Sequence, residues 1–312
     1  MDPILEIQNL SKRYGNHVAV DDISFNVPRG SVFGLLGPNG AGKSTAIGCI
    51  SGLLKPTEGS VRVNGHDVVK DGRAAKQSLG VVPQELSLYE DVSASENLRF
   101  WGAAYGMRGS ELESRAHDVL AYTGLLDRAE EPVKNYSGGM KRRINFGCAI
   151  MHRPKVLLLD EPTVGVDPQS RARLFEMVQE QVEHGMAVLY TTHYREEAEL
   201  LCDERAIVDH GKLIADGTLE ELRGMVGEKD ILRLAGSFAP DKTRAVLSSL
   251  PDVQVVVAES ESIRLAVADA SRRLPELFEA ITATGGEVRE TTLSQPSLET
   301  LFLKLTGKEL RK

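Results

Sequence analysis

The stretch that decides the fold is Gly37-Pro38-Asn39-Gly40-Ala41-Gly42-Lys43-Ser44, which Thr45 follows. It fits the pattern G-x-x-x-x-G-K-[ST], in which the backbone N–H groups of a glycine-rich turn converge on phosphate oxygens. The apolar run 32–36 suits a buried strand before the loop, and residues 46–50 form a plausible helix after it, whose N-terminus adds positive partial charge. Only about 0.01 chance matches are expected in a chain of this length. The pattern therefore predicts a phosphate-binding loop.

Four side chains supply the chemistry of this predicted site. Lys43 brings a positive charge to the β- and γ-phosphates of a nucleotide, and the Ser44 hydroxyl is a hard oxygen ligand for Mg²⁺. A second apolar run, 156–159, ends in Asp160 and Glu161. Asp160 can hold the Mg²⁺ or its waters, and Glu161 can polarise an attacking water as a general base. The alternative for Glu161 is a solvated acid at the end of a strand.

Another loop, residues 137–139, reads Ser-Gly-Gly and opens a helix-like stretch. Two glycines and a serine at a helix N-terminus form an anion site that needs no lysine. An ordinary Ser-Gly-Gly loop is the alternative when the stretch is considered alone. We interpret Arg142 and Arg143, in the same stretch, as a solvated helix face and not as a nucleic-acid patch.

The composition indicates a globular, acidic chain. It has 312 residues, a net charge of −8 and 41% hydrophobic residues, which suffices for a sizeable core. This length favours about two domains. Because binding nucleic acid requires a clustered basic face, the charge argues against nucleic acid as the main partner.

The cysteine content and the hydropathy of the sequence indicate the cellular compartment in which the protein works. Cys49, Cys148 and Cys202 are too few and too far apart for a disulfide framework or a metal knuckle, and they suit a reducing cytosol. Residues 1–10 lack the basic and apolar regions of a signal peptide. No segment approaches the roughly 18 apolar residues of a membrane span. We therefore expect any membrane role to come through a partner protein.

The chain shows two patterns in succession. Up to residue 217, apolar runs alternate with helical patterns, one of them at 92–122, which indicates a mainly parallel α/β sheet. We expect a linker helix within 218–229 and an accessory domain at 230–312 with the order strand, helix, strand, strand, helix, strand. That order is typical of a ferredoxin-like unit. Two helical apolar faces are predicted there: Leu274, Leu277, Phe278 and Ile281, then Leu298, Leu301, Phe302 and Leu305.

Together these elements resemble the nucleotide-binding subunits of ABC transporters, over roughly residues 4 to 217. The resemblance implies a P-loop NTPase cassette: a mainly parallel sheet with an antiparallel β subdomain and a helical subdomain. It implies ATP and Mg²⁺ as ligands and ATP hydrolysis as the reaction. It depends on the order and spacing of the phosphate loop (Walker A), Gln84, the Ser-Gly-Gly signature, Asp160-Glu161 (Walker B), Asp167 and His193.

The resemblance also implies roles for single residues. Tyr14 matches the aromatic residue that stacks on adenine, and Gln84 matches the Q-loop, which touches Mg²⁺ and couples to the membrane partner. His193 matches the switch histidine at the γ-phosphate, and Asp167 matches the D-loop. The alternatives are ordinary packing for Tyr14 and satisfied loop positions for Gln84 and His193.

The full set of implied site residues has three parts. The catalytic residues are Glu161, His193 and Gln84. The metal ligands are Ser44, Gln84 and Asp160. The nucleotide contacts are Tyr14, Gly37, Pro38, Asn39, Gly40, Ala41, Gly42, Lys43, Ser44 and Thr45, with Ser137, Gly138 and Gly139 contributed to the ATP site of the opposite protomer. The resemblance thus implies a dimer of cassettes on ATP binding.

The signature departs from the common Leu-Ser-Gly-Gly-Gln, since Tyr136 and Met140 occupy its ends. The Ser-Gly-Gly core is intact, so the departure bears on helix packing more than on ATP. Beyond the cassette, residues 217–222 and 296–307 resemble the C-terminal extension of drug- and polysaccharide-exporting subunits, the daunorubicin-resistance-like branch.

This second resemblance implies the ATPase subunit of an exporter for drug-, lipid- or polysaccharide-type cargo. Such a subunit is cytoplasmic and is held at the inner face of the cell membrane by separate permease subunits. Two alternatives remain: a non-transport cassette ATPase acting on ribosomes or DNA, and an importer subunit. A single cassette without a coiled-coil insertion disfavours the first, and the C-terminal resemblance disfavours the second.

Overall fold

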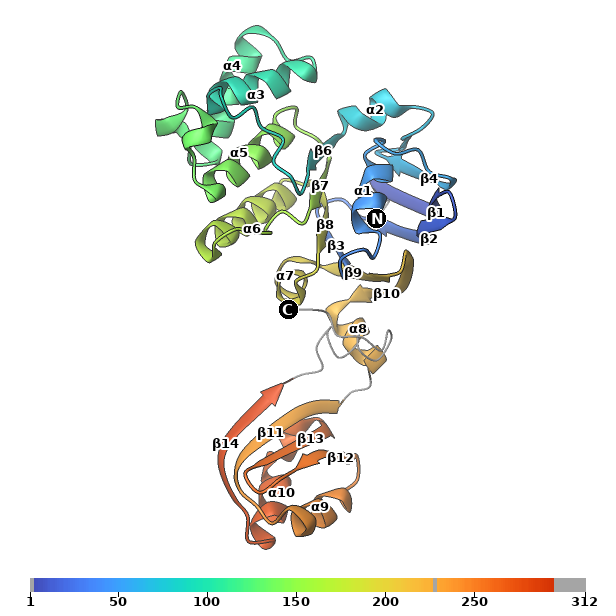
Figure 1. The fold of residues 1–312 in the computed structure, drawn as a ribbon, viewed down its shortest axis with the longest axis vertical. Coiled ribbons are helices and arrows are strands. Elements are labelled where there is room, and N and C mark those ends of the chain that lie inside the picture. Colours follow the sequence, from blue (N-terminus) through green and yellow to red (C-terminus); the bar gives the residue numbers. More distant parts are fainter. Residues whose placement is uncertain (1–2, 227–228, 295–312) are drawn as a thin grey trace. The chain divides into compact units, whose positions relative to one another are not determined.

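The computed structural model describes residues 3–226 and 229–294. Contacts divide the chain into two compact units, with the division between Thr218 and Leu219. Figure 1 labels the helices and strands of both units.

A mostly parallel sheet with the strand order β10-β9-β3-β8-β7-β6 forms the centre of the first unit (Figure 1). Only β10, at one edge, pairs antiparallel within the described part of this sheet. The side chains of β3, β7 and β8 are buried at every position, as expected for parallel strands covered on both faces. The strands are β3 (Val32–Leu36), β6 (Leu79–Val82), β7 (Val156–Asp160), β8 (Ala187–Thr192), β9 (Glu204–Asp209) and β10 (Lys212–Thr218).

An antiparallel sheet with the order β2-β1-β4-β5 packs beside it through helix α1. One continuous hydrophobic core joins side chains of both sheets with those of α1, including Ile47 and Ile50. The elements are β1 (Leu5–Tyr14), β2 (His17–Val27), α1 (Lys43–Ile50), β4 (Glu58–Val63) and β5 (His66–Asp67). The phosphate loop therefore lies where the two sheets meet.

The remaining helices of this unit include a helical subdomain, α3 to α5 (Figure 1). Ser93 and Glu96 form a capping box that starts α3. The stretch 92–122, predicted to be helical, contains the two helices α3 and α4, which a turn containing Gly106, with φ 94°, separates. The helices are α2 (Gly72–Gln77), α3 (Ala94–Ala104), α4 (Gly109–Tyr122), α5 (Gly138–Ile150), α6 (Pro168–Glu183) and α7 (Arg195–Leu201), with 3₁₀ turns at Leu126–Arg128 and Val133–Asn135.

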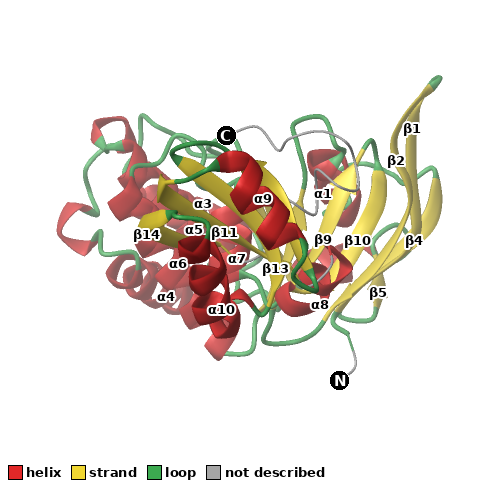
Figure 2. Cartoon of the chain, turned by 90° about the horizontal axis from the view of Figure 1, so that it is seen from below, coloured by secondary structure: helices red, strands yellow, loops and turns green. Residues whose placement is uncertain are grey.

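The second unit has the predicted order strand, helix, strand, strand, helix, strand. Its antiparallel sheet has the order β12-β13-β11-β14, and the two helices α9 and α10 cover one face (Figures 1 and 2). Leu277 and Ile281 of α10 are fully buried against Leu232 and Leu265 of the sheet, which confirms that apolar face. The elements are α8 (Leu219–Val226), β11 (Lys229–Ser237), α9 (Pro240–Ser248), β12 (Val253–Ala258), β13 (Ser262–Ala268), α10 (Ala270–Ala283) and β14 (Glu287–Ser294).

Two further predictions from the sequence concern the apolar face at the C-terminal end of this unit and the presence of membrane-spanning segments. The apolar face at Leu298, Leu301, Phe302 and Leu305 lies outside the described residues. Within 3–226 and 229–294, no helix has the length and apolar character needed to span a bilayer.

A chain that ends at Thr218 should fold on its own and bind ATP, because the first unit contains its own core and the whole phosphate loop. Its thermal midpoint should rise when ATP and Mg²⁺ are added, since a ligand at about 100 times its Kd stabilises the folded state by about 2.7 kcal/mol. The full chain, unfolded under the same conditions, is the control. Aggregation of the shorter chain, or a midpoint that ATP leaves unchanged, would contradict an autonomous first unit.

Candidate active site

The loop between β3 and α1 has the geometry of an anion cradle. Gly40 and Gly42 adopt positive φ angles of 83° and 102°, which other residues rarely tolerate. A Cβ atom at Gly42 would lie 2.3 Å from the backbone oxygen of Ala19, so the loop also needs glycine for space. No side chain caps the N-terminus of α1, which leaves its first N–H groups to face a ligand.

A cavity of about 380 Å³ lies elsewhere in this unit, and a larger one of about 600 Å³ opens over this loop. The larger volume suits a small-molecule ligand. The structure thereby brings Gln84 and Glu161 to the phosphate loop from far along the chain. The lining residues are His17, Val18, Ala19, Asn39, Gly40, Gly42, Lys43, Ser44, Thr45, Gln84, Glu161, His210 and Gly211.

The centre of the site is a chain of charged contacts. The Glu161 carboxylate lies 2.9 Å from Lys43 Nζ through Oε1 and 2.9 Å from His193 Nδ1 through Oε2. Lys43 and Glu161 are only 4% and 6% exposed. Water is largely excluded from the pair, so its electrostatic attraction is stronger than that of a surface ion pair. The carboxylate of Glu161 thus contacts both the predicted phosphate-binding cation and the predicted switch histidine.

The parallel pairing of β7 with β8 produces this arrangement. Asp160 pairs with Thr191, and both strands end at the same edge of the sheet. The Thr191 hydroxyl donates to Asp160 Oδ1 at 2.7 Å and accepts from the Glu161 N–H at 3.0 Å. Glu161 adopts a φ of 44°, an unfavourable backbone region for a non-glycine residue. This turn directs the Glu161 side chain toward Lys43, and Thr191 holds the Asp160 carboxylate and the Glu161 backbone.

The donor set for Mg²⁺ fits the ion chemically. Magnesium prefers oxygen ligands and commonly takes one or two from the protein, with phosphate and water oxygens completing its shell. Ser44 and Gln84 line the cavity, and Asp160 lies directly before Glu161. The described residues contain no cluster of three or more His, Cys, Asp or Glu that could hold a metal by itself. The three oxygen donors therefore fit an ion shared with a nucleotide.

The interpretation of Arg142 as a solvated residue is wrong. Its side chain is buried, and its Nη1 donates to the backbone oxygens of Pro83 and Gln84 at 3.3 and 3.1 Å. Burial also lowers the pKa of this guanidinium. Arg143 donates to the backbone oxygen of Thr123 at 2.7 Å. Arg142 thus holds the backbone of the Q-loop against α5, a role that an Arg-Arg pair in the sequence does not reveal.

Several predicted site residues lie outside the cavity lining: Tyr14, Gly37, Pro38, Ala41, Asp160, His193 and the signature residues Ser137, Gly138 and Gly139. Tyr14 is 48% exposed at the end of β1, whereas His17, after the hairpin turn, does line the cavity. Ser137 caps α5 by accepting from Met140 N at 3.3 Å, and neither it nor the two following glycines reach the phosphate loop of the same chain. Adenine stacking by Tyr14 and the contribution of the signature to a second protomer therefore stay predictions.

Comparison with known proteins agrees with this geometry. The family model "ABC transporter" matches residues 20–164, and "ATP-binding protein DrrA1-3-like, C-terminal domain" matches residues 217–306. The linearmycin resistance ATP-binding protein LnrL of Bacillus subtilis is 44% identical over 99% of this chain and 100% of its own length. The Nod factor export ATP-binding protein I of Ralstonia nicotianae is 37% identical over 99% of this chain and 95% of its own length.

A solved structure described as the ATP-binding subunit of an ABC transporter covers 72% of this chain and 93% of its own length. It superposes with a TM-score of 0.66 at 34% identity. The fold and the site thus define a P-loop ATP-binding cassette, as the sequence predicts. The chain belongs to the ATP-binding subunits of ABC transporters, in the branch with a DrrA1-3-like C-terminal domain, and it hydrolyses ATP.

Replacing Lys43 by alanine should weaken ATP binding about tenfold or more, because a hydrogen bond to a charged group contributes about 1.5–3 kcal/mol. Lys43 is the lysine that lines the cavity among the described residues. Calorimetry with ATP and Mg²⁺ measures the change, and Lys70→Ala, at an exposed lysine, is the matched control. Equal affinity in the two variants would mean that another cation holds the phosphates.

Proposed function

We propose that the chain powers an exporter from the cytoplasmic side of the cell membrane, through separate membrane subunits and for cargo of drug, lipid or polysaccharide type. The observation that carries this proposal is the succession, in one chain, of a cassette and a DrrA1-3-like domain. Two relatives of nearly full coverage support it, since one is named for linearmycin resistance and the other for Nod factor export. Neither the importer nor the ribosome- or DNA-directed alternative has a comparable observation in its favour.

In the proposed reaction Lys43 and the backbone N–H groups of the loop hold the ATP phosphates. Ser44, Gln84 and Asp160 would hold Mg²⁺, which supplies charge neutralisation at the phosphates. Glu161 accepts the proton of the attacking water, and His193 contacts the γ-phosphate. These roles use the geometry of the cavity, in which Glu161 lies within reach of both the loop and His193.

Phosphate binding must rearrange the contacts of Lys43. Its ammonium group has three N–H bonds. They face the oxygens of Gly37 at 2.8 Å, Pro38 at 3.1 Å and the Glu161 carboxylate at 2.9 Å. A phosphate oxygen can accept a hydrogen bond from Lys43 only when one of these three oxygens moves away from the ammonium group. The two carbonyls are fixed in the backbone, whereas the Glu161 carboxylate is repelled by phosphate, so Glu161 leaves and becomes free to accept a proton from water.

Two cassettes would complete the reaction site. The α5 N-terminus, opened by Ser137 and two glycines, presents unpaired N–H groups and positive partial charge. Because it does not reach the phosphate loop of its own chain, we propose that it contacts the ATP bound by a second copy. The ATP-bound chain is then a dimer with two nucleotides between the protomers.

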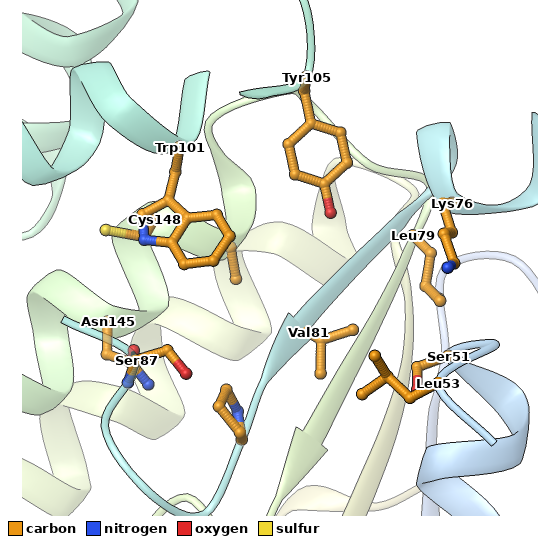
Figure 3. A pocket seen from close by; sticks show the side chains of 12 residues that line it. Ser51, Leu53, Lys76, Leu79, Val81, Ser87, Trp101, Tyr105, Asn145 and Cys148 are labelled. Atoms are coloured by element: carbon orange, nitrogen blue, oxygen red, sulfur yellow. Dashed lines mark hydrogen bonds between the residues drawn. The ribbon is translucent and has the colours of Figure 1, made fainter. Parts of the chain in front are cut away.

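The proposed contact with the membrane subunit is an apolar groove beside α3 (Figure 3). Its volume is about 380 Å³, and Trp101, Val81 and Leu53 lie around it. Leu53 is 76% exposed, and the exposed ring of Phe100 packs edge-on against Trp101. A surface of this kind suits a short amphipathic helix of a permease. The Q-loop borders the groove through Pro83, which would couple docking to Gln84.

Glu161→Gln should keep ATP binding and lower turnover about 10²- to 10⁴-fold, because an amide cannot accept the proton of the attacking water. ATP should then trap a dimer that light scattering detects. Glu113→Gln, which changes an exposed glutamate paired with Arg99, is the control. Ordinary turnover in Glu161→Gln would refute the role of this residue as general base.

Leu53→Asp should prevent co-purification with the membrane subunits while ATP binding by the isolated chain persists, because Leu53 lines the apolar groove and a charge there must be desolvated on docking. The exposed Leu126, which lies outside the lining of the groove, provides the matched control Leu126→Asp. If Leu53→Asp still assembles with the permease, the docking surface lies elsewhere.

A further inference from the structure

A buried carboxylate behind the site collects hydroxyl groups from separate segments. Glu197, on α7, is 2% exposed. Its Oε1 accepts from the Thr163 hydroxyl at 2.7 Å, and its Oε2 accepts from the hydroxyls of Tyr190 and Thr192, both at 2.9 Å. The guanidinium of Arg171, on α6, lies 3.5 Å from Oε1. All these groups except Arg171 are buried.

The hydroxyls of the cluster donate to the Glu197 carboxylate. Tyr190 donates because burial, and then the neighbouring Glu197 charge, raise the pKa of its phenol well above the usual value. Thr192 has a fixed direction too, since its oxygen accepts the N–H of Tyr194 at 2.9 Å and its proton goes to Glu197. Hydrogen bonds to an ionised acceptor are short and strong, and here they offset the cost of burying the charge.

The hydroxyls belong to the segments that carry the catalytic pair. Thr163 lies two residues after Glu161, in a loop whose turns are closed by bonds from Val164 N to Glu161 O and from Val166 N to Thr163 O. Thr192 directly precedes His193. The Thr163 loop follows β7, and Thr192 is the last residue of β8; the two strands lie side by side in the sheet (Figure 1). Glu197 therefore ties together the two chain segments that place Glu161 and His193 within 2.9 Å of each other.

The same cluster reaches the start of α6. Asp167 caps that helix by accepting from Ser170 N at 2.9 Å, and Arg171 N donates to the Asp167 backbone oxygen at 2.9 Å. The Arg171 guanidinium also lies 5.5 Å from the ring of Tyr194. Arg171 therefore links the Glu197 carboxylate to the start of α6, which the D-loop residue Asp167 caps, and to Tyr194, which follows His193.

We propose that Glu197 is a positioning residue for ATP hydrolysis, which holds the Thr163 loop and the His193 segment in the register that the reaction needs. Apolar side chains would avoid the cost of burying a charge, but they would leave the protons of three buried hydroxyls without an acceptor. The carboxylate instead fixes the distances between the segments by directed bonds. The inference rests on the proposed roles of Glu161 and His193.

The Thr163 side chain offers a conservative test. Thr163→Val removes one donor to Glu197 at nearly constant volume, whereas Thr163→Ser retains it. We expect kcat of Thr163→Val to fall about tenfold, since small misplacements of reacting groups have large effects on rate. The Kd of a non-hydrolysable ATP analogue should change less than about twofold, and Thr163→Ser should recover most of the rate.

A matched control separates positioning from stability. The Thr123 hydroxyl is equally buried and bonds the backbone oxygens of Val119 and Leu120, away from the cavity. Thr123→Val should lower the thermal midpoint as Thr163→Val does and leave kcat unchanged. The inference is overturned if Thr163→Val keeps its kcat, if Thr163→Ser is as slow as Thr163→Val, or if analogue affinity falls in parallel with kcat.

Glu197→Gln extends the test to the acceptor itself. An amide nitrogen at the Oε1 position would face Arg171 and the Thr163 hydroxyl, so kcat should fall further while analogue binding persists. A folded Glu197→Gln variant with full kcat overturns the inference, and if this variant does not fold, the Thr163 series decides. Glu161→Gln, assayed in parallel, distinguishes the failures: full turnover there refutes the proposed function, whereas its loss together with full turnover in Glu197→Gln refutes only the role of Glu197.

Discussion

Lys43 lies where two segments far apart in the sequence meet, and its ammonium group connects them. On one side are the carbonyls of its own loop, and on the other is the Glu161 carboxylate at the end of β7. The contact forms because a parallel sheet brings the carboxyl ends of its strands to one edge, where the phosphate loop also begins. Without this convergence of the strand ends, Lys43 of the phosphate loop and Glu161, the proposed general base, would not contact each other.

The site combines local strain with buried charge, and each has a compensating contact. Glu161 departs from ordinary backbone angles, and its N–H is held by Thr191. Its buried carboxylate is compensated by Lys43 and contacts His193. Behind these residues, three hydroxyl donors stabilise the buried carboxylate of Glu197. Such buried polar groups contribute little net stability, and we propose that their arrangement serves the reaction.

The sequence predicted those features whose signal is local. The phosphate loop, the strands beside it and the strand-helix order of the second unit follow from short-range patterns of glycine, charge and apolar residues. Arg142 and Glu197 could not be found in this way, because Gln84 is 58 residues from Arg142 and Thr163 is 34 residues from Glu197, and each pair becomes neighbours only through sheet pairing and helix packing. Within the predicted helical stretch at 92–122, Gly106 is a local signal in the sequence for the turn between α3 and α4.

We propose that ATP takes Lys43 from Glu161 and thereby frees the carboxylate for catalysis. A structure of the unaltered chain with Mg²⁺ and a non-hydrolysable ATP analogue would test this exchange of partners. We expect Lys43 Nζ to contact phosphate oxygens and Glu161 to be separated from Lys43 by more than the 2.9 Å found here, with its carboxylate directed at the γ-phosphate side of the cavity. A bound analogue with the Lys43–Glu161 contact still intact would contradict it.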